Sequence, residues 1–409
     1  MKIKLDLTFS KFFFILMYVS LIIGFFLKEN SSGGSEKDFY FTFFIVEEIS
    51  KDLIKGVNTL INSNIPHFPM HYIILGTFYK YIQNVESLRF IFLQIYILIP
   101  IFFYKCLLEI SIKREKALLL STIIFVSPYF RSSAIWSTTD NTALLFFLIS
   151  VFFFLKINKL RNDYKYLYTF LSIIFLSLSA LTRFYYITFI LYFIFELIKK
   201  NDFKYILING IFSLIIFFPS VAYYFITKKL LHNFMTDNIF NNIYINISIF
   251  FFYLIPFIFF SVEKTFHFLN FLKKNFKKIL LIIIILTIFF SNFDYYNNNY
   301  GGGIFYQIIR TYLPYDTYIF YILCIVGSMT IFYVSNKNTK NLILVLIFFF
   351  NFNYMIVYQK YFDPLLVITL LTLFSNITSK LVNKYFVKNF SFMFIYFLVF
   401  FIISLIKNN

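Results

Sequence analysis

Apolar runs of roughly 15–23 residues recur along the whole chain of 409 residues. A helix of about 20 residues crosses the roughly 30 Å hydrocarbon core of a bilayer, so runs of this length predict membrane-spanning helices. Hydrophobic residues make up 60% of the chain and charged residues only 14%, which leaves little material for a separate soluble domain. We therefore expect an all-α fold, a polytopic transmembrane helical bundle that forms a single membrane-embedded domain over residues 1–409.

The hydropathy pattern predicts about 13 spans. The first, Phe12 to Leu27, follows Lys2, Lys4 and Lys11 and has no small-residue cleavage site, so we expect it to be retained and not removed as a signal peptide. The remaining spans are expected near residues 88–108, 117–130, 141–157, 166–181, 184–198, 205–227, 244–262, 279–292, 317–335, 341–358, 364–379 and 390–406.

The distribution of Lys and Arg predicts the orientation of these spans. If the N-terminus is cytoplasmic, the cytoplasmic connectors hold 24 of the 37 Lys and Arg residues and the outer segments hold 13. This asymmetry follows the positive-inside rule. It also gathers most of the unusual polar residues on the outer side, which predicts an active site there. These residues are Glu36, Asp38, His67, His71, Arg131, Asp140, Arg183, the polar stretch 297–303, Arg310, Asp316, Lys360 and Asp363.

The net charge of +18 does not indicate a nucleic-acid partner, because no basic stripe with interleaved aromatic residues lies outside the connectors. The two cysteines, Cys106 and Cys324, both lie inside apolar runs. This placement argues against a disulfide framework and against a cysteine metal site.

The first outer segment, residues 28–70, concentrates chemistry-bearing side chains. It holds six of the 19 acidic residues, including Glu36 and Asp38 just after two glycines. The pattern from Phe39 to Ile61 predicts a helix lying in the membrane interface. Two prolines and two histidines, His67 and His71, then lead into a short apolar helix that we expect to end near Tyr81.

The order of these features resembles a known family. A single span, an acidic motif, an interfacial helix and the segment His67-Phe68-Pro69-Met70-His71-Tyr72 are similar to the membrane-embedded GT-C glycosyltransferases. The likeness is to the bacterial branch related to protein O-mannosyltransferases and the lipid A aminoarabinose transferase. It covers roughly residues 1–200 and is carried further by Glu86-Ser87-Leu88-Arg89, Leu119 to Phe130 with Ser127-Pro128, Thr139-Asp140-Asn141 and Ser179-Ala180-Leu181-Thr182-Arg183.

The resemblance implies an inverting hexosyl- or pentosyltransferase of the bacterial inner membrane, with its active face in the periplasm. Such an enzyme moves a sugar from a polyprenyl-phosphate donor to a hydroxyl of a glycan, lipid or protein acceptor, among membrane lipids. The resemblance places the general base at Asp38, with Glu36 as its partner or substitute. The expected substrate-binding residues are His67, His71, Asp140, Arg183, Arg310 and Lys360. The sequence requires no cofactor and leaves a divalent cation open.

Each of these residues also has a simpler interpretation. Asp38 can be a solvated loop carboxylate, and the two histidines can be structural or can bind a metal together with Asp38. Asp140 can serve the helix N-terminus through the macrodipole. Arg183 can reach the lipid headgroups.

Two other classes of protein share the general pattern. A lipid-linked-sugar flippase or other transporter would place ionisable residues near span centres and show repeat symmetry, and the sequence shows neither feature. An O-antigen-type polymerase would more often carry its longest outer loop late in the chain, whereas here the long loop comes first.

Overall fold

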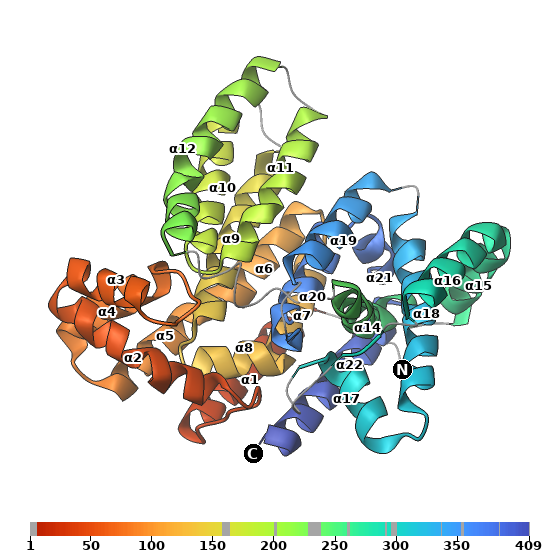
Figure 1. Ribbon diagram of the computed structural model, residues 1–409, viewed down its shortest axis with the longest axis horizontal. Helices are drawn as coiled ribbons and strands as arrows, with labels where there is room; N and C mark the ends of the chain where they lie inside the picture. Colours follow the sequence, from red (N-terminus) through yellow and green to blue (C-terminus); the bar gives the residue numbers. More distant parts are fainter. Residues whose placement is uncertain are drawn as a thin grey trace. The chain divides into compact units, whose positions relative to one another are not determined.

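The computed structural model describes residues 6–157, 164–199, 203–227, 239–259, 262–290, 293–295, 301–336, 338–352, 356–383 and 385–408. Within these ranges all regular structure is helical and no strand occurs, which confirms the predicted all-α class (Figure 1). The chain divides into two compact units, Met1–Leu230 with Phe397–Asn409, and Leu231–Tyr396. The expectation of one membrane domain stays a prediction.

The first unit contains the early helices. They are α1 (Leu7–Phe26), α2 (Ser35–Lys51), α3 (Leu53–Asn62), α4 (Met70–Ile82), α5 (Val85–Tyr96), α6 (Leu98–Glu109), α7 (Arg114–Ser121), η1 (Thr122–Val126), α8 (Pro128–Ile135), α9 (Thr139–Ile157), α10 (Lys165–Ala180), η3 (Phe184–Thr188), α11 (Phe189–Ile198) and α12 (Phe203–Thr227). The central helix is α9, which packs against α6 and α10. Ser150 of α9 and Ser172 of α10 each donate a hydroxyl hydrogen bond to the other's carbonyl oxygen, at 2.7 and 3.1 Å. Small residues of this kind let membrane helices approach closely.

The second unit is built around α14. Its helices are α14 (Ile239–Ile258), α15 (Val262–Lys274), α16 (Phe276–Phe290), α17 (Gly303–Tyr312), α18 (Asp316–Ser335), α19 (Thr339–Asn351), η4 (Gln359–Tyr361), α20 (Leu365–Thr372), α21 (Ile377–Leu381) and α22 (Phe386–Asn408), the last of which continues into the first unit. Helix α14 packs against α17 and α18. A Cβ added at Gly327 of α18 would lie 2.8 Å from Ile247, so the two helices are in close contact there.

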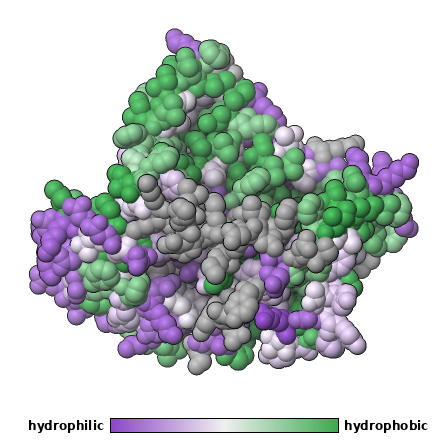
Figure 2. Space-filling view, in the orientation of Figure 1, coloured by the Kyte–Doolittle hydropathy of each residue, from purple (hydrophilic) through white to green (hydrophobic). Residues whose placement is uncertain are grey.

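Seven helices of the described residues are long and apolar enough to cross a membrane, or eight if one bent pair forms a single span. They are Leu7–Phe26, Val85–Glu109 (α5 and α6 taken as one span), Thr139–Ile157, Phe203–Thr227, Asn241–Ile258, Asp316–Ser335 and Phe386–Asn408. Large apolar residues are exposed on several of them, for example along α12 (Figure 2). This surface is compatible with an integral membrane protein, whereas the expected count of 13 is not confirmed.

The difference in span count comes from helices that break or stop early. The expected span 117–130 bends by 72° between Val126 and Pro128, because proline lacks an N–H and forces an extended residue before it. The expected span 364–379 is broken into α20 and the start of α21 at Ile377, and the eight residues of α20, about 12 Å long, are too short to cross. Helices α10, α16 and α19 have 16, 15 and 13 residues.

The expected interfacial helix from Phe39 to Ile61 is two helices, α2 and α3, and the single-helix prediction is wrong. Asp52 lies between them in an extended conformation, and its carboxylate accepts a hydrogen bond from the backbone N–H of Lys55 at 2.9 Å. An aspartate is a strong N-cap, so it starts a new helix here. The short helix expected after His71 is confirmed as α4, which ends at Ile82 beside the left-handed residue Gln83.

A buried polar hub, formed by Glu29, Arg131, Trp136 and Arg89, anchors the segment between α1 and α2. The Nε of Arg131 on α8 donates to the Oε1 of Glu29 at 2.8 Å, and both side chains are buried. The indole of Trp136, the only tryptophan in the chain, donates to the Glu29 carbonyl oxygen at 3.0 Å. The guanidinium of Arg89 on α5 lies 3.7 Å from the centre of the Trp136 ring. The centre of the Tyr40 ring on α2 lies 5.9 Å from the centre of the same Trp136 ring. The hub therefore connects α2, which carries Asp38, to α5 and α8.

Candidate functional site

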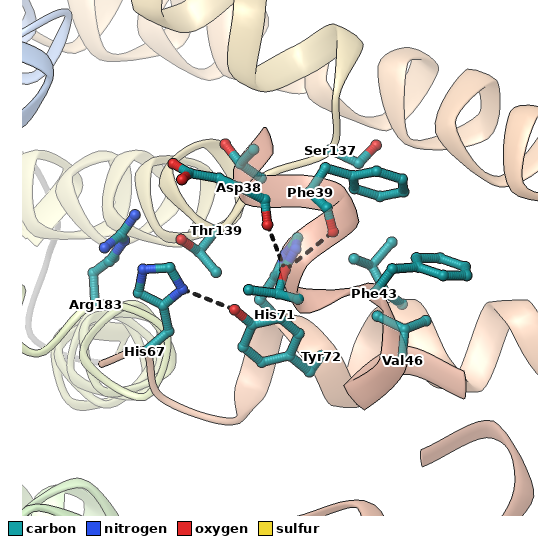
Figure 3. Close-up of a pocket in the computed structure, with 13 residues that line it drawn as sticks. Asp38, Phe39, Phe43, Val46, His67, His71, Tyr72, Ser137, Thr139 and Arg183 are labelled. Carbon is teal, nitrogen blue, oxygen red and sulfur yellow. Dashed lines mark hydrogen bonds between the residues drawn. The ribbon is translucent and has the colours of Figure 1, made fainter. Parts of the chain in front are cut away.

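A pocket in the first unit gathers residues that are far apart in the sequence (Figure 3). It is bounded by α2, by the turn before α4 and α4 itself, by the turn between α8 and α9, and by the turn after α10. Its lining residues are Asp38, Phe39, Thr42, Phe43, Val46, His67, His71, Tyr72, Leu75, Ser137, Thr138, Thr139 and Arg183. Four of the eight residues expected to take part in catalysis or substrate binding thus line one pocket: Asp38, His67, His71 and Arg183.

Asp38 lies in the first turn of α2, which begins at Ser35. Its backbone carbonyl oxygen accepts a hydrogen bond from the Thr42 hydroxyl at 2.9 Å, one turn later (Figure 3). The preceding Gly33 has a φ of +77°, a conformation that favours glycine and turns the chain into the helix.

Glu36 also lies in the first turn of α2 but does not line the pocket. Two residues along an α-helix are separated by about 200° around its axis, so neighbours at this spacing face opposite ways. Only one of the two carboxylates can therefore face the pocket, and it is the carboxylate of Asp38.

Arg183 and Asp140 form an ion pair with a distance of 2.7 Å between Nη2 and Oδ1. Asp140 is in the first turn of α9, and Arg183 lies in the turn between α10, which ends at Ala180, and η3. The antiparallel packing of α9 on α10 brings these two residues together. The Asp140 side chain is 24% exposed and the Arg183 side chain 12% exposed, so solvent reaches part of the pair. Asp140 does not line the pocket itself, but its ion pair connects it to Arg183, which does.

His67 contacts the pocket beside Tyr72. Its Nδ1 lies 2.8 Å from the Tyr72 hydroxyl, and the two rings are stacked (Figure 3). Burial raises the pKa of Tyr72, so the phenol stays protonated and can donate to His67. The Tyr72 ring itself is fully buried, and it holds the half-buried imidazole in place.

His71 is buried and already bonded within the protein. Its Nδ1 lies 2.8 Å from the Thr142 hydroxyl of α9, which lies 2.8 Å from the Tyr96 hydroxyl of α5. Burial, with a further contribution from the positive charge of Arg183, lowers the pKa of His71 to about 3. The imidazole is therefore neutral near pH 7, and it ties α4 to α9.

Arg310 and Lys360 belong to the second unit. Arg310 is exposed in the last turn of α17, and the ammonium of Lys360 lies 5.4 Å from the centre of the Tyr358 ring. Their expected role in substrate binding stays a prediction. Most of the polar stretch 297–303, namely residues 297–300, lies outside the described residues.

Several residues of the site were not predicted from the sequence. Ser137, Thr138 and Thr139 contribute hydroxyl-bearing side chains to the pocket, and Ser137 has a φ of +47°, which is unusual for a residue other than glycine. Residues in such conformations cluster at functional sites. Thr139 belongs to the segment Thr139-Asp140-Asn141 noted in the sequence, whereas Ser137 and Thr138 had no signal beyond their place in a polar stretch. Within the described ranges, no group of three or more His, Cys, Asp or Glu side chains is placed to hold a metal ion.

Comparison with known proteins adds no relative. The chain matches no protein family model, no curated protein and no solved structure.

Proposed function

We propose that the protein is a membrane-embedded glycosyltransferase of the GT-C type. In this proposal it transfers a sugar from a polyprenyl-phosphate donor to an acceptor hydroxyl at the outer face of a bacterial inner membrane. The observation that supports this most is the single pocket lined by one carboxylate, Asp38, and one guanidinium, Arg183. These are the two charges that such a transfer requires.

The chemistry assigns each charge a step. The Asp38 carboxylate accepts the proton of the acceptor hydroxyl as the hydroxyl oxygen attacks C1 of the sugar. The bond from C1 to the phosphate oxygen breaks on the opposite side, so the configuration at C1 inverts. The polyprenyl phosphate leaves with its electron pair, and Arg183 donates hydrogen bonds to its oxygens.

The remaining residues of the pocket orient the reactants. Asp140 holds the Arg183 guanidinium through the ion pair of 2.7 Å, so the arginine does not have to be ordered when the donor arrives. His67, fixed by Tyr72, and the hydroxyls of Ser137 and Thr139 are suited to hydrogen bonding with sugar hydroxyls. Glu36 takes no part in this scheme.

A direct test incubates the purified protein in detergent with radiolabelled polyprenyl-phosphate sugars and measures hydrolysis or transfer. Asp38→Asn keeps the shape of the side chain but removes the proton acceptor, so turnover should fall by about two to four orders of magnitude. Glu36→Gln is the matched control and should retain most of the activity.

Two results would contradict the proposal. A protein that binds these lipids but leaves every one chemically intact would be a carrier and not a transferase. A large loss in Glu36→Gln, with near wild-type turnover in Asp38→Asn, would move the base two residues upstream.

A further inference from the structure

Four lysines surround the junction of α15 and α16 in the second unit. Lys273 and Lys274 end α15, Asn275 makes the turn, and Lys277 and Lys278 lie in the first turn of α16. All four lysine side chains are exposed. No ion pair joins any of them to a carboxylate within the described parts of the chain. Four ammonium groups within six residues repel one another, so an anionic ligand would stabilise this junction.

Large apolar side chains are exposed beside these lysines. One face of α15 is packed: Phe268 and Phe271 contact the ring of Tyr333 on α18 at 5.4 and 5.1 Å. Away from that face, Phe266 is 63% exposed and Phe276 is 64% exposed. Figure 2 shows hydrophilic and strongly hydrophobic residues side by side over α15 and α16.

Helix α16 continues the apolar surface. Its residues beyond the lysines are almost all aliphatic or aromatic, and several are exposed: Leu280, Leu281, Ile284, Ile285, Ile288 and Phe289. A row of lysines at one end of such a surface lies where lipid headgroups meet lipid chains.

We propose that the α15–α16 junction is a binding site for anionic phospholipid. The lipid phosphate accepts hydrogen bonds from the ammonium groups of Lys273, Lys274, Lys277 and Lys278. Its acyl chains lie against Phe276 and the exposed side of α16. This site is independent of the pocket at Asp38, and it does not depend on the proposed transferase activity.

The experiment measures retention of radiolabelled phosphatidylglycerol against phosphatidylcholine by the full-length protein in detergent, over a range of NaCl concentrations. The wild type should prefer phosphatidylglycerol, and the preference should weaken as salt rises. Replacing the four lysines by Gln should reduce the affinity for phosphatidylglycerol by about a hundredfold or more. Replacing the same four by Arg should preserve the preference.

The control removes the same charge elsewhere. Lys37, Lys51, Lys55 and Lys80 are exposed in the first unit, and changing them to Gln should leave the preference intact. If the full replacement does not fold, the pairs Lys273/Lys274 and Lys277/Lys278 can be changed separately, and each should give part of the loss.

Three outcomes would overturn the proposal. Equal retention of the two lipids by the wild type would show that no anionic site exists. An equal loss in the control variant would show a general effect of net charge. Displacement of the lipid by the water-soluble headgroup glycerophosphoglycerol at comparable concentration would show a phosphate site that makes no use of the apolar surface.

Discussion

The carboxylate of Asp140 is coupled to the pocket through another side chain. From the sequence, Asp140 and Arg183 are expected to be two separate substrate contacts, whereas the structure joins them in one ion pair of 2.7 Å. No local pattern predicts this pairing, because the two residues are 43 positions apart and are brought together by the packing of α9 on α10. Asp140 is therefore better described as the residue that positions Arg183.

The pair predicts non-additive effects on donor binding. Arg183→Ala should weaken binding of a polyprenyl-phosphate sugar by one to two orders of magnitude, since a charge-assisted hydrogen bond contributes about 1.5–3 kcal/mol. Arg183→Lys should keep part of the affinity. Asp140→Asn should have a smaller effect, and adding it to Arg183→Ala should change nothing further. A donor titration on the four variants checks this, and unchanged affinity in Arg183→Ala would leave lipid-headgroup contact as its role.

His71 predicts how stability depends on pH. Its pKa is about 3 in the folded protein and near 6.5 in an unfolded chain, so between these values only the unfolded state binds the proton. The stabilising contribution is complete above about pH 6.5 and is lost as the pH falls toward 3, by about 1.4 kcal/mol per pH unit. His71→Asn keeps an acceptor for Thr142 and should flatten this dependence of the thermal midpoint. Equal slopes in the wild type and His71→Asn would refute the prediction.

At the scale of elements, the segment between α1 and α2 is held by a buried ion pair. Glu29→Gln leaves the Arg131 guanidinium buried without a counter-charge, which should cost about 3–5 kcal/mol of unfolding free energy. Glu48→Gln removes the solvent-screened contact of 3.2 Å with Lys55 and should leave the thermal midpoint close to that of the wild type. Thermal unfolding in detergent compares the two variants. Equal midpoints would mean that the Glu29–Arg131 pair does not anchor this segment.

The elements show what sequence periodicity can predict. Apolar runs predicted the position of the long helices, such as α9, α12 and α18, because burial or lipid exposure of a helix leaves a continuous hydrophobic signal, but they did not predict α15 or α17. They did not locate the breaks at Asp52 and at Pro128, although both residues are known helix starters. The apolar pattern continues across Asp52 and across Pro128, so it does not show a break at either residue. The breaks come from local capping, since each of these residues starts a new helix. The side-chain contacts across α9 and α10 depend on tertiary packing, which no local pattern contains.

At the scale of the whole molecule, the charge asymmetry predicts which loops share a side of the membrane. Single cysteines at Lys37, Arg183 and Lys360 should react with a membrane-impermeant maleimide from outside, and cysteines at Lys113 and Lys274 only after permeabilisation. Cys106 and Cys324 are buried and can be replaced in the background. If the cysteine at position 183 reacts only from the cytoplasm, one of the helices between α1 and α10 does not cross the membrane. The bent pair Arg114–Val126 and Pro128–Ile135 is the first candidate, because it is a span only if its two halves cross together.

The placement of Trp136 gives the molecule a built-in optical reporter. Its indole is the only one in the chain, and it contacts the Glu29 carbonyl oxygen, the Arg89 guanidinium and the Tyr40 ring at once. When tryptophan is excited at a wavelength that tyrosine does not absorb, the emission of the unlabelled protein therefore comes from one point, where the segment leading to Asp38 meets the body of the first unit. Any rearrangement of that segment when a ligand enters the pocket changes the surroundings of this single fluorophore, so it can be followed in real time without a dye.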